Sequence, residues 1–328
     1  MAGLTEDELI ARFFAPLAGA AGLGLTDDAA ELQAQGALAL TKDMLVAGVH
    51  FFADDPPDAI ARKALRVNLS DLAAKGAAPL GFLLGLALPA ADADWLERFA
   101  QGLGADAAEY AFPLLGGDTV ATPGPLTISV TALGASPPAG MIRRGGVCES
   151  DALFLSGTVG DAALGLRMRL GAAQDRGWID ALGAADAGFL AERYLLPRPR
   201  LALRDALRVH ARAAMDVSDG LAGDLAKMLR LDGLSAEIET RDLPLSAAAA
   251  AALAREPALI ETILSGGDDY EILCVCAPGR AEAFAGAAAR AGVAVKRIGA
   301  ARRGEGAPRF IGEDGAPVAL KRASFGHF

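Results

Sequence analysis

Apolar and polar residues alternate along the chain in segments that predict both helices and strands. A Thr-x-x-Glu capping box at Thr5–Glu8 precedes an amphipathic segment and predicts a first helix. The apolar run at 37–48 predicts a strand that polar residues interrupt at Thr41. A longer helical pattern follows, which we expect Asp58 to cap and which should close near Gly76.

The same alternation continues through the rest of the first half. The apolar run at 81–89 predicts a buried strand ended by proline, and 92–110 predicts a helix. Two further strands are expected on either side of the Pro-Gly-Pro turn at 123–125. Strands mixed with helices in this way indicate an α/β or α+β fold class.

A stretch rich in Pro and Gly at 135–150 interrupts the pattern and predicts a domain boundary. We therefore expect an N-terminal domain at 1–140 and a C-terminal domain at 141–328. The second domain should again mix helices and strands. Its final part predicts an Ala-rich helix at 281–293 and a hairpin-like segment, IGEDGAPVAL, at 311–320.

Composition excludes several classes of protein. The 328 residues carry 41 acidic and 31 basic side chains, a formal net charge of −10, which argues against broad nucleic-acid binding. No apolar run reaches about 18 residues, so no membrane span is expected. The first residues lack a basic segment followed by an apolar one, so no secretory signal is expected.

The three cysteines indicate a reduced, cytoplasmic protein. Cys148 is far in sequence from the other two. Cys274 and Cys276 lie two apart in a strand-like run, and we expect them to point to opposite faces, which would exclude a mutual disulfide. Their spacing matches no metal-binding cysteine motif.

Aspartates recur at strand ends and beside glycines. They are Asp27, Asp28, Asp43, Asp71, Asp118, Asp216, Asp219, Asp268 and Asp269. Mg²⁺ takes carboxylate and phosphate oxygens, so such residues suit a magnesium site if they converge. Without bound cations, their mutual repulsion would be costly.

Some of these aspartates also have a simpler interpretation. Asp27, Asp28 and Asp219 could cap helices, and Asp71 could lie on the solvated face of its helix. Asp43 interrupts an apolar strand, which favours a functional role. The set as a whole is more informative than any single member.

Two pairs of motifs occur at similar spacing. NLSD precedes LLGGDT in the first half, and DVSD precedes LSGGDD in the second. Asp118 follows Asp71 by 47 positions, and Asp268 follows Asp219 by 49. This similarity either arises by chance or indicates two related halves whose acidic loops face a shared cleft.

Other catalytic motifs are missing or misplaced. No P-loop pattern occurs, and GLGADA at 102–107 lies in a helical segment rather than after a strand. His50, His210 and His327 are isolated from one another in sequence. Ser156 lacks a Gly-x-Ser-x-Gly context, so a hydrolase is not indicated.

Several segments together form a recognisable set: DD at 27–28, TKDMLVAGVHF at 41–51, KALRVNLSDLAAKGAAP at 63–79, LLGGDT at 114–119, DVSDGL at 216–221, SGGDDYE at 265–271 and FGHF at 325–328. Through these segments, and over essentially its whole length, the chain resembles the thiamine-monophosphate kinase family. Aminoimidazole ribonucleotide synthetase, selenophosphate synthetase and a hydrogenase maturation protein share the fold of this family. The resemblance implies two domains with mixed sheets flanked by helices, and an acidic cleft between the domains.

The resemblance also implies ATP as phosphoryl donor, thiamine monophosphate as acceptor, several Mg²⁺ ions, and a homodimer formed through the N-terminal domains. The implied metal ligands are Asp28, Thr41, Lys42, Asp43, Asp71, Asp118, Asp216 and Asp219. The implied nucleotide contacts are Gly117, Asp118, Arg144 and Ser218. The implied contacts with thiamine phosphate are His50, Asp268 and Phe325.

Three positions depart from the family pattern. Thr26 stands where Gly is frequent, Lys42 where a small hydroxyl residue is usual, and Asp268 where Glu is usual. Lys42 would preserve its metal site only by offering its backbone carbonyl. Asp268 is one methylene shorter than Glu, so its substrate contact would be displaced or bridged by water.

The implied reaction needs no general base, because a phosphate monoester is already largely a dianion near neutral pH. We therefore expect direct in-line transfer assisted by several Mg²⁺ ions, without a catalytic side chain that removes a proton. The alternatives are another enzyme of the superfamily, such as aminoimidazole ribonucleotide synthetase, or a non-catalytic nucleotide-binding homologue.

Overall fold

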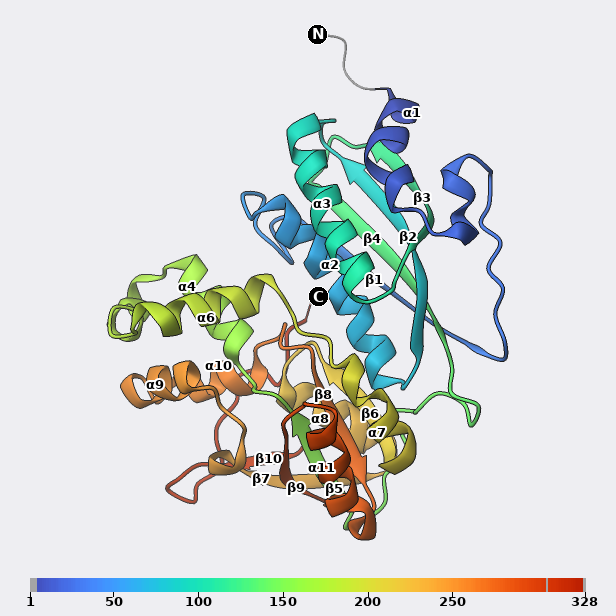
Figure 1. Ribbon diagram of the computed structural model, residues 1–328. Coiled ribbons are helices and arrows are strands. Elements are labelled where there is room, and N and C mark those ends of the chain that lie inside the picture. Colours follow the sequence, from blue (N-terminus) through green and yellow to red (C-terminus); the bar gives the residue numbers. More distant parts are fainter. Residues whose placement is uncertain (1–4, 305, 327–328) are drawn as a thin grey trace. The chain divides into compact units, whose positions relative to one another are not determined.

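The computed structural model describes residues 5–304 and 306–326, which form two compact units (Figure 1). Unit 1 is drawn from the residues up to Leu72 and from Ala77–Met141. Unit 2 is drawn from Ala73–Gly76 and from Ile142 onward. Each unit combines a sheet with helices, which confirms the predicted fold class. The assignment of separate functional domains to 1–140 and 141–328 stays a prediction.

Unit 1 is built on a four-stranded sheet with the strand order β1-β4-β2-β3. β4 pairs antiparallel with β1 and β2, whereas β3 pairs parallel with β2. In chain order the elements are α1 (Glu6–Leu9), η1 (Ile10–Phe14), η2 (Ala15–Leu17), η3 (Ala20–Leu25), β1 (Leu38–Val46), α2 (Pro57–Ala74), β2 (Ala78–Leu88), α3 (Ala93–Glu109), β3 (Leu114–Ala121) and β4 (Thr127–Ala135). The last two residues of α2 belong to unit 2.

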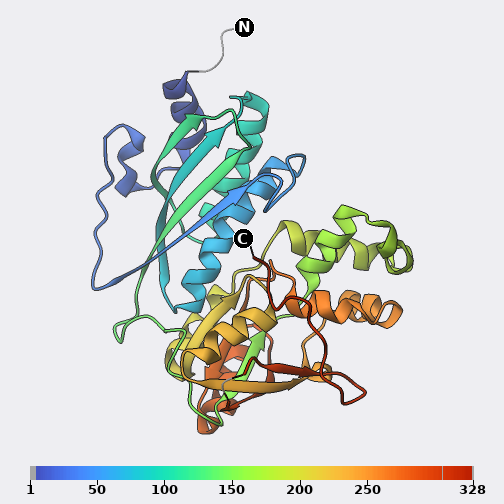
Figure 2. The ribbon, with the colours of Figure 1, turned by 180° about the vertical axis from the view of Figure 1, so that it is seen from behind.

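The two faces of this sheet differ. Val130 and Ala132 of β4 are fully buried. Ala132 lies opposite Thr41, which hydrogen-bonds to Asp71 of α2, so Val130 and Ala132 both face the side that α2 and α3 cover (Figure 1). Thr131, between them, points to the other face because side chains alternate along a strand. Figure 2, seen from behind, shows that no long helix covers this second face, which we call the open face.

The predicted interruption of the first strand at Thr41 is wrong. β1 stays paired with β4 along its whole length, with Thr41 opposite Ala132 and Asp43 opposite Val130. β1 is an edge strand of the sheet, where polar side chains retain access to water. Polar residues therefore interrupt the apolar pattern here without ending the strand.

The predicted helix boundaries are partly confirmed. The capping box is present, since the Thr5 amide donates to Glu8 Oε2 at 2.9 Å and the Glu8 amide donates to Thr5 Oγ1 at 3.3 Å. α2 closes before Gly76, whose φ of +66° suits glycine. Asp58 is not the cap, because α2 begins at Pro57 and places Asp58 in its first turn.

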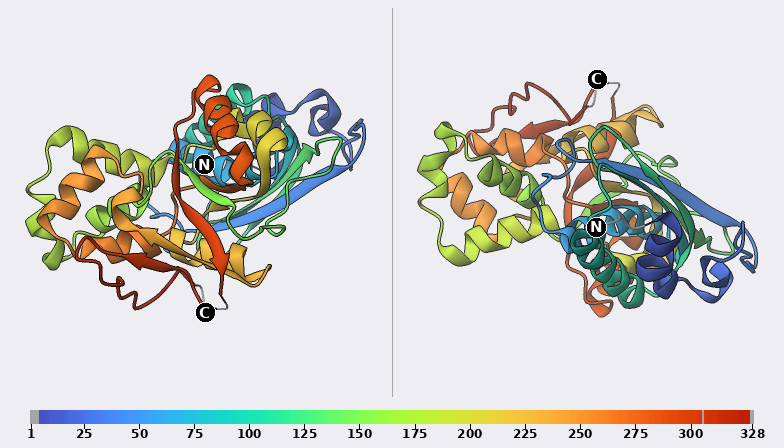
Figure 3. Two further views of the ribbon diagram at one scale, coloured as in Figure 1. Left: turned by 90° about the horizontal axis from the view of Figure 1, so that it is seen from below. Right: turned by 90° about the horizontal axis from the view of Figure 1, so that it is seen from above.

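Unit 2 contains a six-stranded sheet with the order β10-β7-β9-β5-β8-β6. Its elements are β5 (Ala152–Ser156), α4 (Asp161–Leu170), η4 (Ala173–Asp175), α5 (Arg176–Ile179), α6 (Ala184–Leu195), η5 (Leu201–Leu203), α7 (Arg204–His210), β6 (Ala211–Val217), α8 (Leu221–Arg230), β7 (Leu234–Glu239), η6 (Thr240–Asp242), α9 (Ala247–Arg255), α10 (Leu259–Ser265), β8 (Glu271–Cys276), η7 (Pro278–Arg280), α11 (Ala281–Arg290), β9 (Val295–Arg303) and β10 (Arg309–Ile311). Helices α4, α6 and α9 pack together beside the sheet (Figure 3).

Two hydrophobic clusters bury the two faces of this sheet. Leu153 belongs to one cluster and Phe154 to the other, as expected for successive residues of β5. Cys274 and Cys276 both belong to the cluster of Phe154, so the prediction that they point to opposite faces is wrong. Residues two apart in a strand share a face. Both are nevertheless free cysteines, as is Cys148.

The hairpin predicted near the end of the chain is confirmed. The amide of Gly312 donates to the Ala316 carbonyl at 2.8 Å, and the amide of Val318 donates to the Phe310 carbonyl at 2.8 Å. Within the described residues, no helix has the length and apolar character required to cross a bilayer.

Candidate active site

In unit 1, strand β1 and helix α2 bring three predicted metal ligands together. Thr41 and Asp43 lie on the same side of β1, facing α2. Thr41 Oγ1 donates a hydrogen bond to Asp71 Oδ2, and the Asp43 amide donates to Asn68 Oδ1 at 3.1 Å. Asn68 and Asp71 are neighbours on one face of α2. Asp71 is therefore turned toward the sheet, and the alternative that it lies on a solvated face is wrong.

Lys42 and Asp118 lie on the open face instead. Lys42 points away from its neighbours Thr41 and Asp43, and Asp118 of β3 lies opposite Gly85 of β2. Both line a cavity of about 770 Å³ together with Asp27 and Asp28. The cavity also has an apolar wall formed by Ile10, Phe14, Leu25, Leu83 and Leu133.

Close contact between two strands holds Asp118 in place. A Cβ atom on Gly117 would lie 2.0 Å from the Leu84 carbonyl oxygen, so no larger residue fits without moving a strand. The nearest atom to a Cβ on Gly116 would be Leu83 Cδ2 at 3.4 Å, an ordinary contact. The glycine of the LLGGDT motif that precedes the aspartate is thus required by packing.

Asp27 and Asp28 are exposed in the loop that follows η3. The Asp28 amide donates to Asp27 Oδ1 at 2.8 Å. No helix begins here, so the interpretation of these residues as helix caps is wrong. Thr26, the departure from the family pattern, donates from Oγ1 to the Leu23 carbonyl at 2.9 Å.

His50 lies in the turn after β1. Its Nδ1 accepts a hydrogen bond from the Val46 amide at 3.0 Å, so a neutral imidazole carries its proton on Nε2. Its carbonyl accepts from Lys63 Nζ at 3.1 Å. The turn is therefore held from two sides, while His327 lies outside the described residues.

In unit 2, the predicted site residues meet through their backbones. The Ser218 carbonyl accepts from the Asp268 amide at 2.9 Å, and the Asp219 carbonyl accepts from the Phe325 amide at 2.9 Å. Asp216 precedes them at the end of β6 and is 7% exposed. Three segments that are far apart in sequence therefore form one hydrogen-bonded group.

Two residues of this group were not predicted from the sequence. Asp224 Oδ2 accepts from the Ser218 and Asp219 amides, each at 3.0 Å. Lys227 Nζ lies 2.5 Å from Asp219 Oδ2 and 2.9 Å from Asp224 Oδ1. Their spacing of three on an amphipathic helix was the available signal. Asp219 does not cap α8, whose N-cap is Gly220.

Charge and burial are coupled in this group. Burial raises the pKa of Asp224 above its ordinary value, although Lys227 and the Asp219 amide act in the opposite direction. Burial disfavours the charge of Lys227, but its hydrogen bonds to Asp219 and Asp224 produce a net rise in its pKa. Lys227 is therefore a cation held between two carboxylates.

The loop that carries Asp268 has an unusual backbone. Asp268 and Tyr270 adopt φ angles of +73° and +50°, which residues other than glycine rarely adopt. A Cβ on Gly267 would lie 2.3 Å from the Ser218 carbonyl oxygen. The glycine permits the close approach that the hydrogen bond from Asp268 requires.

Buried ionisable side chains support this loop through hydrogen bonds. Asp269 is fully buried and accepts from the Gly160 amide at 2.7 Å, and burial raises its pKa well above the ordinary value. Arg193 donates to the Asp269 carbonyl at 3.2 Å and to Glu271 Oε1 at 3.0 Å. Ser156 Oγ donates to Glu271 Oε2 at 2.6 Å, so this serine is structural.

Arg144 is exposed in the segment that precedes β5. The carbonyl of its neighbour Arg143 accepts from the Ala214 amide of β6 at 3.0 Å. This bond attaches the segment to the strand that ends at Asp216 and Val217.

The paired motifs do not reflect repeated structure. Asn68 and Asp71 lie within helix α2, whereas Asp216 and Asp219 lie at a strand end and in a loop. Similarly, Asp118 lies in strand β3, whereas Asp268 lies in a loop. The motifs of each pair therefore have similar spacing in the sequence but lie in different kinds of secondary structure.

No three His, Cys, Asp or Glu residues of the described chain are arranged to hold a metal ion by themselves.

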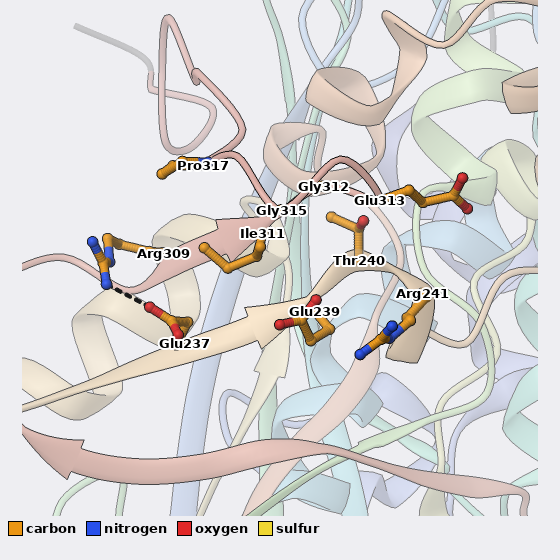
Figure 4. A pocket seen from close by; sticks show the side chains of 10 residues that line it. All are labelled: Glu237, Glu239, Thr240, Arg241, Arg309, Ile311, Gly312, Glu313, Gly315 and Pro317. Atoms are coloured by element: carbon orange, nitrogen blue, oxygen red, sulfur yellow. Dashed lines mark hydrogen bonds and ion pairs between the residues drawn. The ribbon is translucent and has the colours of Figure 1, made fainter.

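A second cavity, of about 540 Å³, lies in unit 2 between β7, β10 and the hairpin (Figure 4). Glu237 and Arg309 form an ion pair there, and none of the predicted site residues lines this cavity.

Comparison with known proteins identifies the family. The sequence models of AIR synthase related proteins match at residues 26–136 for the N-terminal domain and 149–308 for the C-terminal domain. The chain is 45% identical to the thiamine-monophosphate kinase of Caulobacter vibrioides over 96% of this chain and 90% of the relative.

Two solved structures are similar in sequence and fold. The thiamine-monophosphate kinase of Stenotrophomonas maltophilia has a TM-score of 0.77 and 37% identity, covering 90% of this chain and 91% of that one. AaThiL, complexed with AMPPCP and TMP, has a TM-score of 0.75 and 30% identity, covering 89% and 87%. These similarities confirm the resemblance seen in the sequence motifs. The chain is an enzyme that belongs to the thiamine-monophosphate kinase family, within the AIR synthase related proteins.

Proposed function

We propose that this kinase transfers the γ-phosphoryl group of ATP to thiamine monophosphate and forms thiamine diphosphate. The structural observation that carries the proposal is the hydrogen-bonded group of Ser218, Asp219, Asp268 and Phe325. It joins a residue expected to contact ATP, a metal ligand and two residues expected to contact thiamine phosphate. The relative complexed with AMPPCP, an ATP analogue, and TMP supports the same pair of substrates.

Nucleotide binding is assigned to Gly117, Asp118, Arg144 and Ser218. The cavity beside Asp118 has an apolar wall and a few polar groups, and its volume lies in the range of small-molecule sites. Thiamine phosphate is assigned to His50, Asp268 and Phe325. Phe325 is 50% exposed, and an aromatic ring at this position suits stacking on a cationic thiazolium.

Magnesium ligands are assigned to Asp28, Thr41, Lys42, Asp43, Asp71, Asp118, Asp216 and Asp219. These residues offer the oxygen donors that Mg²⁺ prefers, and the Asp219 carboxylate already pairs with one cation, the ammonium of Lys227. Because the Lys42 side chain points to the open face, away from Thr41 and Asp43, we assign only its backbone carbonyl. Waters and phosphate oxygens would complete each coordination shell.

The chain has to position two polyanions and needs no general base. Bound Mg²⁺ would offset the charge repulsion between the substrates. The acceptor phosphate is already anionic near neutral pH, so the loops act by orientation, and the fixed backbones of Ser218, Asp219 and Asp268 suit that role. We propose direct in-line transfer without a phosphoenzyme.

We further propose a homodimer that forms through the open face of unit 1. Leu40, Met44 and Val120 are 64%, 52% and 50% exposed on this face. Leu40 and Met44 lie in one edge strand and Val120 in the other, and exposed apolar side chains across a sheet face favour association with a second copy. A cytoplasmic location and the absence of nucleic-acid partners stay predictions.

The test is a steady-state assay with ATP, Mg²⁺ and thiamine monophosphate that follows thiamine diphosphate directly. We expect product from the wild type and a loss of roughly a hundredfold in kcat/KM, about 2.7 kcal/mol, for Asp219→Asn. Asp180→Asn, an exposed aspartate on another surface, is the matched control and should be unaffected.

Free thiamine should give no comparable rate, because its hydroxyl group would require a base. Lack of product from thiamine monophosphate, with ATP binding intact, would contradict the proposal and favour another acceptor of the superfamily. Failure to turn over any acceptor would favour a non-catalytic nucleotide-binding protein.

A further inference from the structure

Lys227 has a position that the proposed chemistry does not use. Its ammonium group lies between the carboxylates of Asp219 and Asp224, at 2.5 Å and 2.9 Å. Asp219 is the proposed metal ligand, so the lysine occupies one of the oxygen atoms that a divalent cation would need.

The two carboxylates differ in their freedom. Asp224 is 1% exposed, and its second oxygen is committed to the Ser218 and Asp219 amides. The side chains of Lys227 and Asp219 are 35% and 39% exposed. The Asp224–Lys227 pair is therefore the fixed part of the group, and the Asp219–Lys227 contact is the part that can exchange.

The main chain of Asp219 is held independently of this contact. Its amide donates to Asp224 at 3.0 Å, and its carbonyl accepts from the Phe325 amide at 2.9 Å. Exchange of the carboxylate's partner thus requires no movement of the loop. Only the end of the lysine side chain has to withdraw toward Asp224.

We propose that Lys227 is a built-in counter-ion that competes with the divalent cation for Asp219 and so sets the affinity of this site. When the cation is absent, Lys227 neutralises Asp219 and keeps its carboxylate oriented. When the cation binds, Lys227 remains paired with Asp224 alone. Lys227 is a positioning residue because it acts through Asp219, and the inference rests on the proposed role of Asp219 as a metal ligand.

The direction of the effect follows from charge. A lysine ammonium near a divalent cation repels it and also occupies its ligand. Replacing Lys227 with methionine keeps the length and apolar stem of the side chain and removes both effects. Unit charges about 4 Å apart at a partly exposed site interact strongly enough that we expect roughly tenfold tighter cation binding.

The experiment measures Mn²⁺ binding by electron paramagnetic resonance on the full chain, with saturating AMPPCP and no thiamine monophosphate. Wild type, Lys227→Met, and Lys227→Arg are compared, each also in an Asp219→Asn background. We expect tighter binding for Lys227→Met, near wild-type binding for Lys227→Arg, and no effect of Lys227→Met once Asp219 is replaced.

Equal or weaker Mn²⁺ binding by Lys227→Met would overturn the inference. So would an equal gain in the Asp219→Asn background, or wild-type Mn²⁺ binding that does not depend on Asp219. If Lys227→Met is less stable than the wild type, the rise in melting temperature on adding Mn²⁺ still ranks the variants by their affinity for the cation. Because no turnover is involved, a failure of the proposed kinase reaction would appear separately, in the assay for thiamine diphosphate.

Discussion

The two units hold most of their predicted site residues in different ways. In unit 1, Thr41, Asp43 and Asp118 lie in strands, and Asp71 lies in a helix. In unit 2, Ser218, Asp219 and Asp268 lie in loops. The first arrangement depends on sheet register, and the second depends on hydrogen bonds between loops and on glycines that permit close approach. The same types of ligand can therefore be fixed by regular structure or by interlocked loops.

Replacing Gly117 with alanine tests the dependence on sheet register. A Cβ there would lie 2.0 Å from the Leu84 carbonyl, so β3 has to move away from β2. We expect a loss of about 3 kcal/mol in the free energy of unfolding, as for other overpacked positions. Gly116→Ala, with a nearest contact of 3.4 Å, should lose less than about 1 kcal/mol. Urea unfolding of both variants measures this, and equal stabilities would contradict the register argument.

Gly267→Ala gives the corresponding test in unit 2. The new Cβ would lie 2.3 Å from the Ser218 carbonyl, but here a loop rather than a strand can shift. We expect a smaller loss of stability than for Gly117→Ala and a rise of roughly tenfold in the KM for thiamine monophosphate. A large loss of stability with an unchanged KM would show that the loop belongs to the rigid core.

Met44→Glu tests whether the open face of unit 1 forms the proposed homodimer. Met44 is 52% exposed, and a carboxylate buried at an interface would be strongly disfavoured. We expect the dimer dissociation constant to rise at least tenfold, about 1.4 kcal/mol, in sedimentation equilibrium. Leu170→Glu, at a 60% exposed position of unit 2, is the matched control. If both variants behave as the wild type does, the dimer uses another surface.

Asp269→Asn tests how the stability of the chain depends on pH through a buried carboxyl group of unit 2. Burial raises the folded-state pKa of Asp269 above its unfolded value, so the folded chain binds more protons than the unfolded chain. Its contribution to stability is therefore present at low pH and is lost as pH rises through the folded pKa.

Relative to Asp269→Asn, the wild type should be less stable at pH 8 than at pH 5. Chemical unfolding at both pH values measures this, with Asp180→Asn as control. A difference between wild type and Asp269→Asn that does not vary with pH would contradict the assignment.

The sequence was sufficient for the fold class, the helix at 92–110 and the hairpin near the end, because each has a clear periodicity or turn pattern. It did not show that β1 continues through Thr41, because polar residues on an edge strand look like an interruption. It also did not show which face of the sheet carries Lys42 and which carries Thr41 and Asp43, since this depends on the pairing of β1 with β4.

The loops of unit 2 were the hardest part to predict. The motif residues Ser218, Asp219 and Asp268 were recognisable, but Asp224 and Lys227 look like ordinary polar positions of an amphipathic helix. Asp224 accepts hydrogen bonds from the backbone amides of Ser218 and Asp219, whereas Lys227 donates to the Asp219 carboxylate. The spacing of the two residues along the helix does not specify these partners. Metal count, dimer and site roles stay predictions.

The hydrogen bond from the Phe325 amide to the Asp219 carbonyl has a consequence for the synthesis of the chain on the ribosome. The two residues are roughly a hundred positions apart, so at about 5–20 residues per second a ribosome makes the second at least several seconds after the first. Asp224 and Lys227, by contrast, follow Asp219 by only five and eight positions. The ribosome therefore adds the lysine that balances the charge of this loop long before it adds the segment that completes the hydrogen bonds of the loop.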